Sequence, residues 1–289
     1  MFGECHAHII MDGKNYRRAV ELHKKEIQLP VIREHLEAYS RRNITFIRDG
    51  GDAFGVSLKA REIAPEYGID YRTPGFAIHK NGHYGGIVGH GFSTIKEYHN
   101  LVNEAASKGA DFIKIMTTGI LDFADNGRIT GEALSHEEVK EMIHIAHEEG
   151  FAVMCHTNGN AAIRDVISCK ADSIEHGNHM DEDTVELLAE SKTVWVPTIS
   201  TIHNLLGSGR FEDAAIQMLE DKASQRIQEA YKRGALVALG SDAGAYCVFH
   251  GQGILDEYTL FKGILGNSPE IDRWLSRGES EIRKRFRRQ

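Results

Sequence analysis

The chain has 289 residues, of which 41% are hydrophobic and 26% are charged, as is usual for a soluble globular protein that can bury a core. A mean hydropathy of -0.35 and a content of five prolines exclude a fibrous or low-complexity protein. The 34 basic and 42 acidic residues give a net charge of -8, which argues against a nucleic-acid or anionic-membrane partner.

Short apolar runs alternate with amphipathic stretches along the chain, and the two patterns predict strands and helices respectively. In chain order, the predicted strands cover residues 2–9, 44–50, 71–78, 110–119, 151–159, 171–177, 193–200 and 235–244. The predicted helices cover residues 31–42, 54–67, 95–108, 136–149, 160–168, 181–191, 211–233 and 253–265. Gly109, Gly150 and Gly234 each follow a predicted helix, where a glycine C-cap is expected.

Strands that alternate with helices, and that are too apolar to face water, predict a parallel sheet closed into a (β/α)8 TIM barrel. The alternative is a doubly wound open sheet, which would have a glycine-rich turn after its first strand. Residues 8–13 do not supply that turn, and the glycine-rich run at 85–91 follows the third predicted strand instead. That run is weak evidence for a phosphate-type loop, and a flexible loop at the barrel mouth is its other interpretation.

We expect one barrel domain over residues 1–265 and a polar, basic, helix-prone tail over residues 266–289. Residues 11–30 are long for a connection and predict a short helix over the barrel mouth. Five of the six residues at 283–288 are basic. They favour a solvated helix end over an interaction patch.

The cysteines are few and scattered, and none forms a CxxC pair, so we expect them to be reduced; they are Cys5, Cys155, Cys169 and Cys247. Met1 is not followed by a basic and apolar leader, and no apolar run approaches the roughly 18 residues that span a bilayer. These patterns predict a cytoplasmic protein that does not enter a membrane.

Polar side chains gather where the predicted strands end, which is where barrel enzymes carry their active sites. The chain has 16 histidines against 11 tryptophans and tyrosines together. The residues at the strand ends are His6, His8, Lys114, His156, His176 and Asp242. Each alone is explained as a hydrogen-bonded core residue or a turn residue. Together they would be a costly cluster of buried polar groups unless a cation organises them, which favours a zinc-like metal.

These residues lie in five motifs, HAH, IKIMTTG, CHTNG, SIEHG and GSDAG, whose order resembles the metal-binding signature of the amidohydrolase superfamily. The likeness is greatest to its imidazolonepropionase-like and dipeptidase-like branch, and His250 with Gly251 resembles a further element of that branch. The resemblance implies two divalent metal ions of the zinc type. His6, His8 and Asp242 would hold one, and His156 and His176 the other. Lys114, carboxylated by carbon dioxide, would bridge both.

The sequence departs from the family in one respect, since relatives usually carry a small β-sandwich domain built from strands before the HxH motif. Only five residues precede His6, and the tail is predicted to be helical. We therefore expect a barrel without the sandwich, either as a natural branch or as a trimmed chain. Whether the chain forms a homo-oligomer is left open.

The position of Lys114 between two isoleucines is consistent with carboxylation, because burial lowers the pKa of an amine and a neutral amine adds carbon dioxide. An unmodified lysine paired with an acidic residue is the alternative. A water bridging two metals would have its pKa lowered to about 7 and would attack a carbonyl as hydroxide. Asp242 would take its proton and deliver it to the leaving group.

The predicted reaction is hydrolysis of an amide bond in a small molecule such as a dipeptide, an N-acyl amino acid or a cyclic amide. A lactonase or esterase, a barrel lyase or isomerase, and a non-catalytic metal-binding protein are the alternatives. His83 resembles the loop histidine that family members use to hold the scissile carbonyl. Arg48 would face a substrate carboxylate or, as we favour, pair with Asp49 or Asp52. The other polar candidates for substrate contact are His79, Tyr84, His90, His203 and Tyr246.

Overall fold

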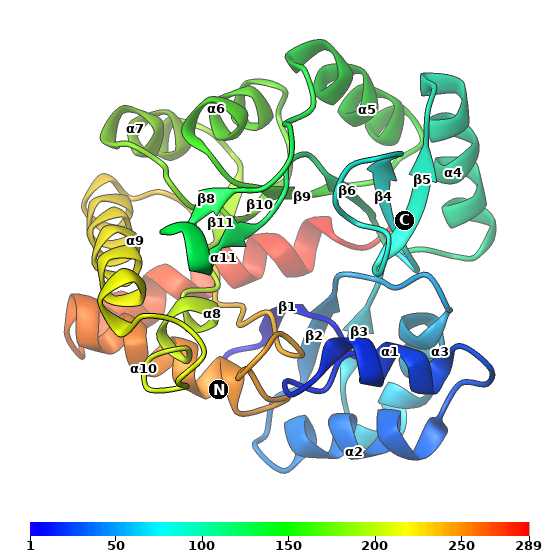
Figure 1. The fold of residues 1–289 in the computed structure, drawn as a ribbon, viewed down its shortest axis with the longest axis horizontal. Coiled ribbons are helices and arrows are strands. Elements are labelled where there is room, and N and C mark those ends of the chain that lie inside the picture. The colour runs from blue at the N-terminus through cyan, green and yellow to red at the C-terminus, as the bar shows by residue number, and fades with distance from the viewer. Residues whose placement is uncertain (289) are drawn as a thin grey trace.

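The computed structural model describes residues 1–288 and shows an α/β fold, in which helices surround a ring of parallel strands (Figure 1). The strands of one parallel sheet, in the order β1-β2-β3, are β1 (Glu4–Ala7), β2 (Phe46–Asp49) and β3 (Asp70–Arg72). The second sheet has the order β11-β10-β9-β6-β4-β5 and comprises β4 (Ala77–Lys80), β5 (Gly89–Phe92), β6 (Ile113–Met116), β9 (Val153–Thr157), β10 (Ser173–His176) and β11 (Val194–Val196). A short antiparallel hairpin, β7 (Leu121–Asp122) and β8 (Arg128–Ile129), lies in the connection after β6.

Two features connect the sheets into a ring. The third predicted strand is divided into β3, which pairs with β2, and β4, which pairs with β6. Pro74 lies in the break, where a residue without an amide hydrogen cannot continue a ladder. On the opposite side, residues 235–244 form backbone bridges rather than a regular strand. The amide of Ala238 donates to the Trp195 carbonyl in β11 (3.0 Å), and the Leu239 carbonyl accepts from Cys5 in β1 (3.1 Å).

The predicted helices are present with closely similar bounds. They are α2 (Leu29–Ser40), α3 (Val56–Ile63), α4 (Ile95–Ser107), α5 (His136–Glu148), α6 (Asn160–Ser168), α7 (Glu182–Glu190), α9 (Asp213–Arg233) and α10 (Gly253–Leu265). Additional helices are α1 (Tyr16–His23), α8 (Ser200–His203), α11 (Pro269–Arg285) and two 3-10 turns, Ala64–Tyr67 and Phe123–Asp125. Helix α1 lies in the segment where a short helix was predicted. The three predicted capping glycines adopt left-handed φ angles of 71°, 77° and 72°, as expected for glycine C-caps.

The hydrophobic core has two parts. A large part fills the space between the strands and the surrounding helices. A smaller part lies within the ring and consists of Cys5, Phe46, Phe112, Met154, Val194, Val196 and Ala238 together with Ile282 and Phe286 from the tail. Helix α11 therefore covers the bottom of the ring, the end opposite the mouth, and lies behind the strands in Figure 1.

The basic end of the tail is largely solvated, as expected, since Lys284, Arg287 and Arg288 are exposed and Arg283 and Arg285 are half-buried. Two of these side chains also contact aromatic rings of the barrel. The guanidinium groups of Arg283 and Arg288 lie 4.1 Å and 4.3 Å from the ring centroids of Phe46 and Phe151. The aliphatic part of an arginine packs well on such rings while its charge interacts with their faces. Arg283 and Arg288 thus help to hold the tail against the barrel.

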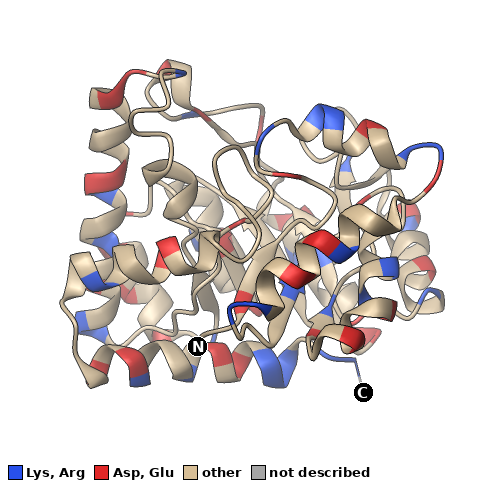
Figure 2. Cartoon of the chain, turned by 90° about the horizontal axis from the view of Figure 1, so that it is seen from below, with Lys and Arg blue, Asp and Glu red and all other residues tan. Residues whose placement is uncertain are grey.

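The outer surface carries both signs of charge. Acidic and basic residues are interspersed along the helices on the side drawn in Figure 2. Within residues 1–288, every helix is too short or too polar to cross a bilayer.

Candidate metal centre

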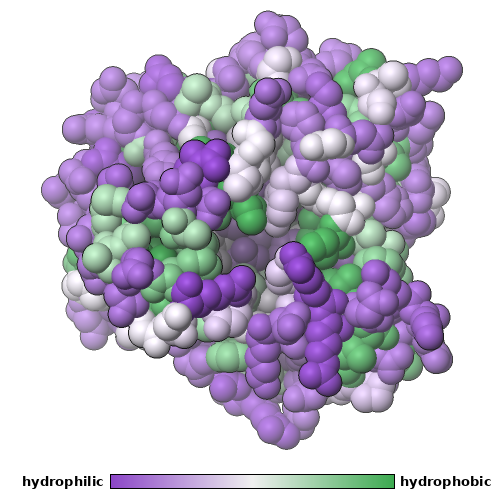
Figure 3. Space-filling view, viewed as in Figure 1, coloured by the Kyte–Doolittle hydropathy of each residue, from purple (hydrophilic) through white to green (hydrophobic). Residues whose placement is uncertain are grey.

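The centre of the face in Figure 3 is hollowed, with hydrophilic residues inside the hollow and apolar residues on parts of its rim. This face is the mouth of the ring, where the strands end. His6 belongs to β1, and His8 is the first residue after the end of that strand. Because side chains alternate along a strand, both imidazoles point to the same side. Only 0% and 7% of their surfaces are exposed.

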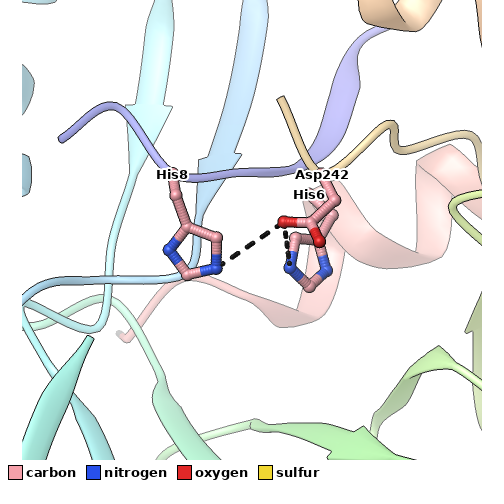
Figure 4. A group of neighbouring side chains, drawn as sticks. All are labelled: His6, His8 and Asp242. Atoms are coloured by element: carbon pink, nitrogen blue, oxygen red, sulfur yellow. Dashed lines mark ion pairs between the residues drawn. The ribbon is translucent and has the colours of Figure 1, made fainter. Parts of the chain in front are cut away.

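Asp242 completes a compact group with these two histidines. Its Oδ1 lies 3.5 Å from Nε2 of His6 and 3.8 Å from Nε2 of His8, and the three side chains point toward one another (Figure 4). Within residues 1–288, this is the group of metal-ligating side chains whose ligand atoms all lie within 4.8 Å of one another. Two imidazole nitrogens and a carboxylate oxygen are common ligands of zinc.

Lys114 reaches the same point from β6. Its side chain is buried, with 1% of the residue exposed, and its Nζ lies 3.3 Å from Nε2 of His6. Burial lowers the pKa of Lys114 to about 8, although the nearby charges of Glu175 and Asp242 oppose that change. A substantial fraction of the amine is then neutral under mildly alkaline conditions.

His156 and His176 extend the cluster. The ring centroid of His176 is 5.0 Å from that of His6 and 4.7 Å from that of His156. The structure thus places all six candidate ligands at one end of the ring, with His6, His8 and Asp242 closest together. The assignment of His156 and His176 to a second metal remains a prediction.

Each of the four imidazoles uses one ring nitrogen for a contact outside the six candidate ligands. The contacted nitrogens are Nδ1 of His6 (Glu175 Oε2, 2.6 Å), Nδ1 of His8 (Gly51 carbonyl, 3.3 Å), Nε2 of His156 (Gly119 carbonyl, 3.0 Å) and Nδ1 of His176 (Thr198 Oγ1, 2.8 Å). Metal-binding histidines typically have such a contact on the second nitrogen, which fixes the ring and its tautomer.

Burial also favours the uncharged form of these rings. It lowers the pKa of His8 and of His156 to about 3, and it lowers the pKa of His6 and of His176 well below the usual range. Neutral imidazole is the form that binds a metal. The donor set therefore fits divalent cations.

The backbone around the site is shaped for these side chains. His176 and Asp242 have left-handed φ angles of 66° and 58°, which non-glycine residues rarely adopt. A Cβ at Gly50 would lie 2.3 Å from Cε1 of His8, so only glycine leaves room for this ring. Strained backbone of this kind is concentrated at functional sites.

Arg48 does not have either of the predicted roles. Its side chain is fully buried within the ring, where Nη2 donates to both oxygens of Glu175 at 2.8 and 3.0 Å. It thus cannot bind a substrate at the mouth, and its acidic partner is neither Asp49 nor Asp52. Asp49 instead accepts from the amide of Ile9 at 2.7 Å. Sequence reasoning missed Glu175, although a glutamate in a fully buried strand signals a charge inside the barrel.

The structure gives the loop residues different surroundings. Nδ1 of His83 lies 3.1 Å from the carbonyl of Glu132, whereas the ring of the next residue, Tyr84, lies 5.3 Å from that of His156. Of the surface of Tyr84, 39% is exposed. Of these two loop residues, Tyr84 is the one with a contact to a proposed ligand. The role of His83 stays a prediction.

The remaining polar candidates are engaged by the protein itself. His79 contacts the Lys80 carbonyl, His90 stacks on Phe76, His203 contacts Glu220, Tyr246 lies beneath Arg210, and His250 contacts Tyr39 and the Met11 carbonyl. None of these contacts shows a substrate site.

The model of the amidohydrolase family matches residues 5–271, nearly the whole ring. The chain belongs to the amidohydrolase family. It is 30% identical over 201 residues to ochratoxinase from Aspergillus niger, covering 66% of this chain and 39% of that protein. An uncharacterized protein of Mycobacterium tuberculosis is 31% identical over 172 residues, covering 56% of this chain and 44% of that protein. The chain thus matches less than half the length of these relatives.

Solved structures share the fold. An amidohydrolase superposes with a TM-score of 0.81 and 22% identity, covering 98% of this chain and 74% of that chain. A Xaa-Pro dipeptidase with bound methionine has a TM-score of 0.77 and 21% identity, and the match covers 98% of this chain and 75% of that chain. The structure of Aspergillus niger ochratoxinase has a TM-score of 0.77 and 21% identity, and the match covers 96% of this chain and 69% of that chain. The predicted fold and family are thereby confirmed.

Proposed function

We propose that this amidohydrolase-family chain is a metal-dependent hydrolase that cleaves the amide bond of a small molecule. The observation that carries the proposal is the compact group of His6, His8 and Asp242 at the mouth of the ring, beside the buried amine of Lys114. When bound, two divalent metals of the zinc type would polarise the substrate carbonyl and supply a nucleophile at neutral pH.

The residues of the chain have distinct parts in this proposal. His6, His8 and Asp242 would hold one metal, and His156 and His176 would hold the other. The amine of Lys114 would add carbon dioxide and release a proton, and the resulting carbamate would supply ligand oxygens to the metals. A carboxylate oxygen of Asp242 accepts the proton of the attacking nucleophile and passes it to the departing amine nitrogen.

Tyr84 and His83 are the proposed contacts for the substrate. The Tyr84 ring lies 5.3 Å from that of His156, and this supports a hydrogen bond from its hydroxyl to a substrate held at the metals. The name of the dipeptidase neighbour and that of ochratoxinase guide the choice of test compounds. Dipeptides, including Xaa-Pro dipeptides, and N-acyl amino acids come first.

We also propose that the protein works in the cytoplasm, since all four cysteines are unpaired, as is typical of proteins in a reducing compartment.

The test is to purify the protein after growth with zinc and bicarbonate, measure its metal by elemental analysis, and screen these amides together with matched esters and lactones. Hydrolysis of an amide that stops when the metal is chelated, and returns when zinc is restored, supports the proposal. Turnover restricted to esters or lactones would replace amide hydrolysis by the alternative activity. A protein that binds zinc and hydrolyses none of these compounds would contradict the proposed reaction.

A further inference from the structure

A buried ion pair lies directly beneath the metal centre, inside the ring. Arg48 from β2 and Glu175 from β10 are both 0% exposed. The guanidinium also donates from Nε to the carbonyl of Cys5 (2.7 Å) and from Nη1 to Oγ of Ser173 (2.8 Å). All three of its nitrogens are thus hydrogen-bonded, which holds the guanidinium in one orientation.

Glu175 connects this pair to a proposed ligand. Its Oε2 lies 2.6 Å from Nδ1 of His6, while its two oxygens accept from Arg48. A carboxylate bound to a guanidinium only accepts hydrogen bonds, so the proton of a neutral His6 must be on Nδ1. The lone pair is then on Nε2, the atom that faces Asp242 and Lys114.

The C-terminal tail closes this arrangement from below. The ring of Phe286 is fully buried, and its centroid lies 4.4 Å from the guanidinium carbon of Arg48. The aromatic face interacts with the cation and excludes water from the side away from the metal centre. A contiguous series of contacts therefore runs from the tail through Arg48 and Glu175 to His6.

We propose that Arg48, Glu175 and Phe286 are positioning residues that hold His6 in the tautomer and orientation needed to bind a metal, and so set the metal affinity of the site. This inference rests on the metal binding of the proposed function. It gives the buried ion pair a role, because a buried ion pair is often no more stabilising than apolar residues of similar size. It also makes the tail part of the metal site rather than a separate appendage.

The test compares zinc affinities by competition with a chromophoric chelator, a measurement that needs no substrate. Replacing Glu175 alone would leave the Arg48 charge buried without a partner and endanger folding. The main variant is therefore Arg48→Met with Glu175→Leu, which removes both charges and leaves Nδ1 of His6 without an acceptor. A second variant, Arg48→Met with Glu175→Gln, removes the charges but retains an amide oxygen as acceptor.

We expect the Met/Leu variant to bind zinc about 10- to 100-fold more weakly than the wild type, which is the usual effect of losing a partner of a metal-binding histidine. The Met/Gln variant is expected to bind zinc more tightly than the Met/Leu variant and more weakly than the wild type. Phe286→Ala should weaken zinc binding less than either, since it exposes Arg48 without removing the contact to His6.

The matched control is an arginine–aspartate pair elsewhere in the barrel, Arg61 and Asp111, joined at 3.1 Å. The hydrogen bonds of this pair go to the backbone of Gly109 and Thr73, and not to a proposed ligand or to the tail. The variant Arg61→Met with Asp111→Leu should lose stability but keep the wild-type zinc affinity.

Two results would overturn the inference: a folded Met/Leu variant with the wild-type affinity, or an equal loss of affinity in the Arg61 and Asp111 control. A wild-type protein that binds no zinc would overturn the proposed function itself, and the inference with it.

Discussion

Asp242 combines a left-handed backbone with a position between two imidazoles, and both features bear on its proposed chemistry. Holding a non-glycine residue in this conformation costs roughly 1–3 kcal/mol. The conformation lets the carboxylate approach both Nε2 atoms, at 3.5 and 3.8 Å. Burial raises the pKa of Asp242 to about 6, with Lys114 opposing, so the group is largely ionised at neutral pH and able to accept a proton.

The first prediction concerns this proton transfer. Asp242→Asn should lower kcat by on the order of 100-fold or more and retain most of the metal, because asparagine offers an oxygen ligand but accepts no proton. The measurement is kcat at matched metal content. Asp221→Asn, an exposed change on α9, is the control. Near wild-type turnover in Asp242→Asn would limit Asp242 to a ligand and move the proton transfer to another group.

The second prediction concerns Lys114. Lys114→Ala should lose metal and activity together, because the proposed carbamate bridges the two metals. Short carboxylic acids such as acetate or propionate are expected to restore part of both by occupying the space of the lost group. Metal content and turnover are measured with and without the acid, and the exposed Lys108→Ala serves as the control. Unchanged metal content in Lys114→Ala would make this residue an ordinary buried lysine.

At the scale of elements, α10 is tied to α8 by a buried carboxyl group. The two oxygens of Glu257 accept from the amides of Ile199 (3.1 Å) and Ser200 (2.8 Å). Burial nevertheless raises the pKa of Glu257 from 4.5 to about 7, because desolvation outweighs these hydrogen bonds. The folded protein therefore keeps a proton on this group in a pH range where the unfolded chain releases it.

The third prediction follows from that difference. Between pH 4.5 and 7 the folded state binds more protons at Glu257, so the contribution of this group to the free energy of unfolding falls as the pH rises. The effect amounts to about 3 kcal/mol. A glutamine at position 257 does not titrate. Between pH 4.5 and 7, the free energy of unfolding of Glu257→Gln should therefore fall by about 3 kcal/mol less than that of the wild type, as measured by urea unfolding at several pH values. The exposed Glu141→Gln is the control, and parallel pH curves for the wild type and Glu257→Gln would refute the prediction.

The elements also show how far the sequence could predict the structure. Helix α6 begins and ends at the predicted residues, and the Ser135 and Glu138 side chains form a capping box at the start of α5. Such local signals lie within a few residues of one another. The division of the third strand into β3 and β4 was not predicted, because it depends on which neighbours each half pairs with.

In the site, too, local sequence patterns could be predicted and contacts between distant residues could not. The six candidate ligands could be found because each lies at the end of an apolar run, and the topology brings those ends together. The pairing of Arg48 with Glu175 joins residues 127 positions apart and depends on strand order and register. The closeness of Tyr84 to His156 depends on the course of a loop. Neither follows from a local pattern.

At the scale of the whole molecule, the ring is closed below by the tail and bears the candidate ligands above. Family members share this fold with TM-scores up to 0.81 among those compared, while the chain covers 39% of the ochratoxinase sequence. Because the proposed ligands come from β1, β6, β9, β10 and the segment that follows residue 240, a bound metal would connect strands all around the ring. Metal binding should therefore stabilise the entire fold.

The last prediction is that the protein binds about two zinc ions per chain and that their removal lowers Tm. Six candidate ligands exceed the four of a single tetrahedral site. A ligand that binds only the folded state, present at 100 times its Kd, adds about 2.7 kcal/mol of stability. At roughly 2 °C per kcal/mol for a chain of this size, each site should raise Tm by about 5 °C. Elemental analysis and thermal unfolding, with and without a chelator, measure both quantities, and Lys114→Ala should show a much smaller response to the chelator. One zinc per chain would exclude the binuclear centre, and a Tm that does not respond to chelation would show that the metal does not link the strands.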